Sequence, residues 1–119
     1  MTGCDVALAR LPQADGLIKL RPVLLLLQLP PFGDWLLCGI SSQTQHFVAD
    51  FNKVIDPTHQ DFAPSGLKTS SLVRLGFLAT LPESQLAGRL GMISKERHAR
   101  LLGKLSAHLR PALLPPLAP

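Results

Sequence analysis

The segment that most constrains the fold is residues 21–31, RPVLLLLQLPP, in which a run of seven residues with one polar member lies between prolines. A helix that spans a bilayer takes about 20 apolar residues, so this segment is too short to be a membrane anchor. Proline cannot donate to the hydrogen bonds of a sheet and is tolerated only at the beginning or the edge of a strand. The segment therefore predicts a fully buried β-strand that begins at Arg21 and ends at Leu29.

Short apolar segments alternate with turn-forming residues over residues 1–93. The segments that predict strands are residues 5–11, 21–29, 34–41, 46–51, 70–81 and 87–93. Gly16 lies in a turn-rich connection and is expected to have a positive φ angle, whereas Gly76 interrupts a strand where a bulge would fit. Because strands joined by short loops pair antiparallel, these segments indicate a mostly antiparallel sheet.

The apolar period changes after Ser94, where leucines recur at helical spacing. The leucines are Leu101, Leu102, Leu105 and Leu109, and the basic residues Lys95, Arg97, Arg100 and Lys104 fall mainly on the other faces of the helix. Ser94 is a typical N-cap residue, and Pro111 is expected to end the helix. The sequence therefore predicts one domain over residues 1–110, mainly β with a C-terminal α-helix, followed by a proline-rich tail over residues 111–119. We expect a small barrel or strongly bent sheet of 5–7 mostly antiparallel strands.

The composition predicts a folded domain with a modest attraction for anions. Of 119 residues, 46% are hydrophobic and 17% are charged, which argues against a disordered chain. The formal net charge of +4 favours an acidic partner, with nucleic acid the commonest class. Cys4 and Cys38 are isolated, so we expect free thiols. The first residues carry two acidic side chains and no sustained apolar segment, so we expect a cytoplasmic protein without a signal peptide.

Familiar signatures of catalysis and of metal binding are absent from the sequence. It contains no phosphate-binding glycine loop, no nucleophile elbow and no zinc-protease motif. Asp56, His59 and Asp61 lie close together, but three such side chains in one loop are more typical of a solvated turn than of a metal site. We therefore expect no metal and no cofactor.

One pair of polar side chains is brought together by the predicted hairpin. Arg21 begins one strand and Ser41 ends the next, and in an antiparallel hairpin these two positions are neighbours. A guanidinium and a hydroxyl that meet at a sheet edge form a phosphate site, because arginine gives a planar, bidentate and permanently charged contact. On the pattern alone, an arginine outside a strand and a serine in a turn are the commoner explanation.

Several motifs, taken in order, resemble those of a known family. They are CDVALARLP (4–12), KLRPVLLLLQLP (19–30), WLLCGISSQ (35–43), SGLKTSSLVRLGFLATLPESQLAGRLGMIS (65–94) and the helix after Ser94. This order is similar to that of the PemK/MazF family of toxins from type II toxin–antitoxin systems, over about Asp5 to Leu109. The resemblance implies a small SH3-like barrel of the PemK/MazF/CcdB type with a C-terminal helix, usually a homodimer.

The resemblance also implies an activity and its residues. Members of this family are mRNA interferases, endoribonucleases that cleave single-stranded RNA without a metal, by attack of a ribose 2′-OH on the adjacent phosphorus. Arg21 and Ser41 stand at the positions of the catalytic pair, and Lys19, Ser42 and Gln43 at positions that hold RNA. A cognate antitoxin is the implied partner, with an acidic tail that occupies the RNA groove.

The chain departs from the family pattern at two positions. Ser41 replaces a threonine, which keeps the hydroxyl but loses the methyl group that restricts its rotamers. Cys4 stands where a glycine is common. An alternative function is therefore a catalytically weak or inactive barrel that binds nucleic acid or antitoxin. A gyrase poison with the same barrel ranks last, because the end of the helix has no clear equivalent of the gyrase-binding residues.

Overall fold

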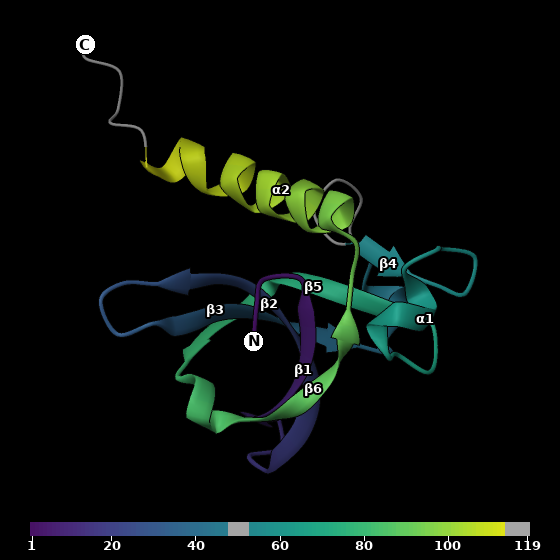
Figure 1. Ribbon diagram of the computed structural model, residues 1–119, viewed down its shortest axis with the longest axis horizontal. Helices are drawn as coiled ribbons and strands as arrows, with labels where there is room; N and C mark the ends of the chain where they lie inside the picture. The colour runs from purple at the N-terminus through teal and green to yellow at the C-terminus, as the bar shows by residue number, and fades with distance from the viewer. Residues whose placement is uncertain (48–52, 114–119) are drawn as a thin grey trace.

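The computed structural model describes residues 1–47 and 53–113, and in this part of the chain six strands form one antiparallel sheet with a long helix across it (Figure 1). The strands are β1 (Asp5–Pro12), β2 (Ile18–Leu29), β3 (Asp34–Ser41), β4 (Lys53–Ile55), β5 (Ser71–Leu81) and β6 (Leu86–Met92), and the helices are α1 (Phe62–Ser65) and α2 (Lys95–Leu113). The spatial order of the strands is β4-β5-β3-β2-β1-β6. The expected architecture, mainly β with a C-terminal helix, is confirmed.

Both faces of the sheet are buried, which explains the unbroken apolar run in β2. One face packs under α2 in a helix-side core that contains Leu24, Leu26, Cys38, Val73, Leu75, Leu101 and Leu105. The opposite face forms an inner core that contains Ala7, Ala9, Leu11, Val23, Leu25, Trp35 and Leu37. Successive side chains of a strand point to opposite faces, so consecutive leucines of β2 supply both cores. Leu24, Leu25 and Leu26 are all at most 1% exposed.

The open sheet curls until its last strand meets the short helix α1. Gly66 follows α1 with a φ of 76°, and a Cβ at this position would lie 2.3 Å from the backbone oxygen of Leu90 in β6. A Cβ at Gly91 would lie 2.1 Å from the backbone oxygen of Pro64. Two glycines therefore allow the backbones of α1 and β6 to approach more closely than side chains would permit.

Three local expectations are confirmed. Gly16 has a φ of 82°, in the turn between β1 and β2. The β5 strand bulges at Gly76, because Gly39 pairs with Arg74 whereas its neighbour Cys38 pairs with Leu78. Ser94 caps α2, because its Oγ accepts a hydrogen bond from the Arg97 amide at 3.1 Å.

Three expected boundaries are wrong. The strand predicted over residues 46–51 is replaced at its start by a 3-10 turn, Thr44–His46, and residues 48–51 lie outside the described residues; β4 begins at Lys53. β2 begins at Ile18, so Pro22 lies inside the strand. Pairing between β2 and β3 starts only at Val23, so Pro22, which has no N–H, does not have to donate a hydrogen bond to β3. The helix α2 continues to Leu113, because a proline in a last turn removes one hydrogen bond without stopping the final residues.

The loop that contains Asp56, His59 and Asp61 is largely open to solvent, as expected, but Asp61 at its end is buried, and Arg97 does not face solvent. Asp61 is 8% exposed and Arg97 6%. Arg97 Nε and Nη2 donate to the Asp61 carboxylate at 2.7 and 3.0 Å, and the Ser94 amide donates to the same carboxylate at 3.1 Å. The pair fastens the segment after β4 to the start of α2. In the described part of the chain, no helix is long and apolar enough to cross a membrane.

Candidate functional site

The register of the sheet sets Arg21 and Ser41 against each other. Ladder pairing between β2 and β3 starts at Val23–Gly39, and the same register continued toward the open end of the hairpin sets Arg21 across from Ser41. On its other side Arg21 pairs with Ala9 of β1, and Ser41 pairs with Leu72 of β5. The ladder itself ends at Val23–Gly39, so the juxtaposition of Arg21 and Ser41 stays a prediction, one that this register supports.

Both side chains belong to the same face of the sheet. Val23 and Leu37 lie in the inner core. Arg21 comes two residues before Val23 on β2, and Ser41 comes four residues after Leu37 on β3, so both point to the same face as the inner core. At this end the apolar core has run out: Arg21 is exposed and Ser41 is half-buried. The inner-core face thus ends in a guanidinium and a hydroxyl that solvent can reach.

The Ser41 hydroxyl is already oriented by the backbone. Ser41 Oγ accepts a hydrogen bond from the Gln43 amide at 3.0 Å, in a turn that leads out of β3. A hydroxyl has one hydrogen to donate besides its acceptor lone pairs. With the oxygen engaged as acceptor, the hydroxyl hydrogen is available to donate to an incoming anion.

The other predicted contact residues surround this pair. Lys19 lies on β2, one strand repeat before Arg21, and is exposed. Ser42 and Gln43 follow Ser41 directly and are also exposed, and the Gln43 side chain accepts a hydrogen bond from Gln45 Nε2. All three therefore lie at the same end of the sheet as Arg21 and Ser41.

A further cation, which the sequence analysis did not single out, lies at this end. Arg74 of β5 pairs directly with Gly39, and its guanidinium carbon lies 5.4 Å from the centre of the Phe77 ring. Arg74 and Phe77 are separated by a bulge whose size could not be deduced from the sequence. The signal that could have found Arg74 is its place as a lone charge in the apolar strand SLVRLGFLATL.

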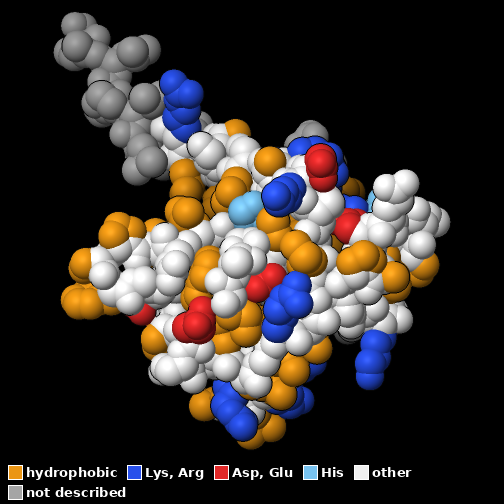
Figure 2. Space-filling view, viewed as in Figure 1, with side chains coloured by type: hydrophobic (Ala, Val, Ile, Leu, Met, Phe, Trp, Pro, Cys, Tyr) orange, Lys and Arg blue, Asp and Glu red, His pale blue; other side chains and the backbone are white. Residues whose placement is uncertain are grey.

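The electrostatics of this end favour an anion. Among the residues that the structure describes, no carboxylate lies within ion-pair distance of Lys19, Arg21 or Arg74. Figure 2 shows Lys and Arg side chains gathered at the lower end of the molecule, where Figure 1 places the turn between β1 and β2. Asp15, in that turn, accepts a hydrogen bond from the Leu17 amide at 2.9 Å.

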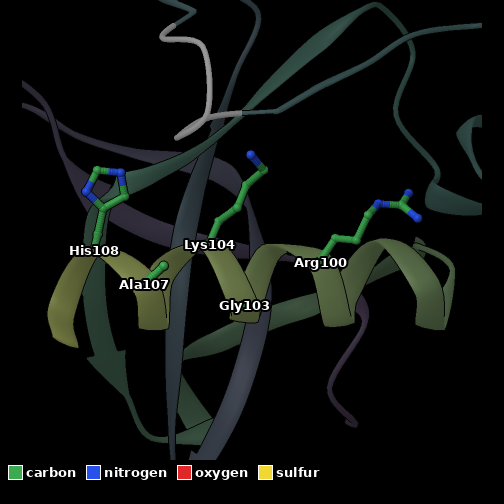
Figure 3. Close-up of a pocket in the computed structure, with 5 residues that line it drawn as sticks. All are labelled: Arg100, Gly103, Lys104, Ala107 and His108. Atoms are coloured by element: carbon green, nitrogen blue, oxygen red, sulfur yellow. The ribbon is translucent and has the colours of Figure 1, made fainter.

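A second basic surface lies along α2 (Figure 3). Arg100, Lys104 and His108 project from one side of the helix above Gly103 and Ala107, beside a hollow of about 500 Å³. This surface carries positive charge but lacks a hydroxyl next to a cation in the same register. Within the described ranges, no three His, Cys, Asp or Glu side chains are grouped to hold a metal ion.

Solved structures similar to this chain are toxins and endoribonucleases, although no family model and no curated protein matches the sequence. The Mycobacterium tuberculosis toxin MazF-mt6 superposes with a TM-score of 0.65 at 20% identity, over 89% of this chain and 96% of the toxin. A structure described as an endoribonuclease in complex with its cognate antitoxin, from a mycobacterial species, gives a TM-score of 0.68 at 15% identity, over 98% of this chain and 99% of that one. The protein therefore has a MazF-like fold.

Proposed function

We propose that this protein is the toxin of a type II toxin–antitoxin system, a metal-independent endoribonuclease that cleaves single-stranded RNA. The observation that supports the proposal is the β2–β3 register, which, continued past the Val23–Gly39 pair, would bring Arg21 opposite Ser41 on one face of a MazF-like sheet. In the part of the chain that the structure describes, no carboxylate forms an ion pair with Arg21, and Ser41 Oγ accepts the Gln43 amide while its own hydrogen stays available. The comparison covers 96% of the MazF-mt6 toxin and 99% of the endoribonuclease.

The chemistry needs charge stabilisation and geometry more than a covalent nucleophile. The ribose 2′-oxygen gives its proton to water and attacks the adjacent phosphorus, the bond from phosphorus to the 5′-oxygen breaks, and the 5′-oxygen takes up a proton from water. The products are a 2′,3′-cyclic phosphate and a 5′-OH. Arg21 neutralises the charge that accumulates on the phosphate oxygens. Because an arginine stays protonated in proteins, it acts by electrostatics and by assisting the leaving oxygen, and it does not remove the 2′ proton.

Ser41 has a complementary role in this proposal. Its oxygen accepts the Gln43 amide hydrogen, so its own hydrogen donates to a non-bridging phosphate oxygen. Lys19, Ser42 and Gln43 hold the RNA on either side of the reacting phosphate. Hydrogen bonds to charged groups are the stronger class, which suits a site that lies open to water.

The proposed partners follow from the same surface. The cations at the open end of the β2–β3 hairpin attract RNA, and they attract an antitoxin with an acidic tail that competes with RNA for the same residues. We also propose a homodimer that acts in the cytoplasm, where the RNA is.

The direct test is cleavage of single-stranded RNA in EDTA. We expect the wild-type protein to cut and to leave 2′,3′-cyclic phosphate and 5′-OH ends, and Arg21→Ala to be inactive. Arg100→Ala, which removes an equal charge from the surface along α2, is the matched control and should cut normally. Equal cutting by Arg21→Ala and wild type would point to a contaminating nuclease and would contradict the proposal.

The serine at position 41 supports a second candidate function. Without the threonine methyl group the hydroxyl is less restricted, so the same barrel would bind RNA or antitoxin without rapid cleavage. Retained RNA binding by the wild-type protein, with no cleavage products over long incubation, would select this binding module over the nuclease.

A further inference from the structure

The chain that leaves β3 is held by its own hydrogen bonds as it passes the candidate site. The Gln43 amide donates to Ser41 Oγ at 3.0 Å. The Phe47 amide closes the 3-10 turn that follows, Thr44–His46, by donating to the first carbonyl of that turn at 3.1 Å. Gln45, the middle residue of the turn, therefore lies on backbone that is hydrogen-bonded on both sides.

The side chains of Gln43 and Gln45 are bonded to each other above this turn. Gln45 Nε2 donates to Gln43 Oε1 at 2.5 Å, and both side chains are exposed. A glutamine amide carries an acceptor oxygen on one side and an NH2 group with two donors on the other. Because its oxygen is turned toward Gln45, Gln43 turns its NH2 group the opposite way. The outward end of Gln43 is therefore a hydrogen-bond donor.

A side chain that presents a donor alone discriminates between the bases of RNA. Uracil and guanine carry a carbonyl oxygen, O4 or O6, where cytosine and adenine carry an amino group. An NH2 group donates to the carbonyl, whereas it meets the amino group donor against donor. A glutamine that uses both its oxygen and its NH2 group can bind adenine, but the oxygen of Gln43 is engaged by Gln45. Single-stranded RNA is the form whose base edges are open to such contacts.

We propose that Gln45 is a positioning residue that fixes the Gln43 amide with its NH2 group outward, so that the site prefers a keto base, uracil or guanine, at the nucleotide that Gln43 contacts. This inference rests on the proposed function, because it adds a base preference to the hold on RNA assigned there to Gln43. Gln45 acts through Gln43 and does not touch the reacting phosphate. We expect a preference of about fivefold, the change in an equilibrium that one neutral hydrogen bond gives.

The test measures base preference at every position of one RNA pool. The probe is single-stranded RNA with several randomised positions, incubated with the protein in EDTA, and the new ends are sequenced. A pool of the same sequences with 2′-deoxyribose throughout cannot be cut, and sequencing its bound fraction gives the preference in binding. For wild type we expect one position at which uracil and guanine exceed cytosine and adenine about fivefold. Gln43→Ala should abolish the preference at that position.

Two substitutions at position 45 separate orientation from other effects. In Gln45→Glu the carboxylate can only accept, so Gln43 turns its NH2 group inward, and the preference at the same position should reverse to cytosine and adenine. In Gln45→Ala neither orientation is favoured, and the ratio should approach one. Gln60→Glu adds the same charge at another exposed glutamine, beside the start of α2, and should keep the wild-type ratio.

The ratio between bases is the readout that a merely structural role would not move. A lost fold or an added negative charge lowers cleavage or binding for all four bases alike, and the ratio measured within one pool cancels such a loss. A keto preference that persists in Gln45→Glu would overturn the inference. So would a wild-type preference for amino bases at the position that Gln43→Ala affects, because the Gln43 oxygen would then face the RNA.

The two proposals fail in distinguishable ways. If wild type cleaves RNA and Arg21→Ala does not, but Gln45→Glu leaves every ratio unchanged, the nuclease stands and the role of Gln45 is wrong. If wild type does not cleave RNA, but its binding to the deoxyribose pool shows a keto preference that Gln45→Glu reverses, the nuclease is wrong and the role of Gln45 stands. A wild-type protein that neither cleaves nor binds would overturn both.

Discussion

At the scale of single residues, Cys4 departs from the pattern of the PemK/MazF family, which this sequence resembles, while it keeps its place in the fold. Its φ is 77°, a left-handed value that costs most residues with a Cβ about 1–2 kcal/mol. The conformation persists because the backbone on both sides is bonded: the Cys4 amide donates to Leu25 at 3.3 Å, and its carbonyl accepts from the Ile93 amide at 2.9 Å. A glycine, common here in the family, would adopt this conformation without strain.

We expect Cys4→Gly to be more stable than Cys4→Ala, which reverses the usual order of these two residues. Both variants remove the buried thiol, but only alanine keeps the strained Cβ. Glycine loses about 0.5–1 kcal/mol through the entropy of the unfolded chain and regains about 1–2 kcal/mol of strain, so it should lead by about 0.5 kcal/mol. Urea unfolding of the two variants measures the difference; a clear advantage for alanine would show that the site carries no strain.

The Ser41 hydroxyl should carry a large part of catalysis. Ser41→Ala removes one donor to the transition state and should lower kcat about 10²–10³-fold, as losses of single oxyanion donors do. Ser41→Thr keeps the donor, restores the restricted rotamer and should cleave at least as fast as wild type. Single-turnover cleavage at saturating RNA measures this, with Ser42→Ala as the control that should change KM more than kcat. An alanine variant as fast as wild type would remove Ser41 from the mechanism.

At the scale of elements, the contact between α1 and β6 depends on backbone rather than on side chains. Gly91→Ala would force a Cβ to within 2.1 Å of the Pro64 oxygen, a clash that cannot be relieved by turning a side chain. Gly88 lies in the same strand with nothing within 4 Å of its added Cβ. We expect Gly91→Ala to lower the free energy of unfolding by about 3 kcal/mol or more, since overpacking a fixed site costs 1–3 kcal/mol even where neighbours relax.

Gly88→Ala is the matched comparison for this prediction. It changes the same residue type in the same strand, and it should alter the free energy of unfolding by less than about 1 kcal/mol in either direction. Denaturant titration of both variants gives the difference directly. Equal stabilities for the two variants would mean that α1 moves away from β6 at little cost.

Strands that are marked by runs of buried apolar side chains could be predicted from the sequence. The positions of side chains that depend on a contact with a distant residue could not. The run from Val23 to Leu26 and the strand Asp34–Ser41 were predicted because apolar side chains fill both cores. The sequence predicts Arg97 away from the leucine face of α2 because its side chain is charged. Its burial depends on an ion pair with Asp61, which lies 36 residues away and which no local pattern indicates. Arg74 was not singled out because its neighbour Gly39 is fixed by a bulge at Gly76 that no local pattern measures.

At the scale of the whole molecule, where the net charge is +4, two groups of basic side chains have different surroundings. One group is paired with buried carboxylates, and the other is exposed at the open end of the β2–β3 hairpin. The arginines that fasten the fold, Arg89 and Arg97, are paired with Asp5 and Asp61. No carboxylate in the described part of the chain forms an ion pair with the cations at the open end of the β2–β3 hairpin, and under the proposed function they bind RNA. We therefore expect stability and RNA binding to respond to different variants and to different conditions.

The buried Asp61–Arg97 pair predicts how stability depends on acid. Burial by itself would raise the pKa of Asp61, but the hydrogen bonds from Arg97 and from the Ser94 amide outweigh it and hold the pKa at about 2, below its ordinary value of 3.8. A carboxyl whose pKa is lower in the folded state contributes stability that is complete above the ordinary pKa and is lost as pH falls toward the folded value. Asp5 is shifted in the same direction: burial opposes the shift, and the Thr2 amide and Arg89 outweigh it.

We therefore expect the free energy of unfolding of wild type to fall between about pH 4 and pH 2, the interval between those two pKa values. Asp61→Asn should lose about 3–5 kcal/mol at neutral pH, because Arg97 then stays buried without its counter-charge. The double variant Asp61→Asn with Arg97→Met removes both charges and should recover part of that loss. Between about pH 4 and pH 2 its free energy of unfolding should fall less steeply than that of wild type. Urea unfolding at a series of pH values measures all three proteins. An acid dependence of the double variant as steep as that of wild type would place the titrating carboxylate elsewhere. Asp5 and Asp56, whose pKa values are also lowered, would then be the next groups to test.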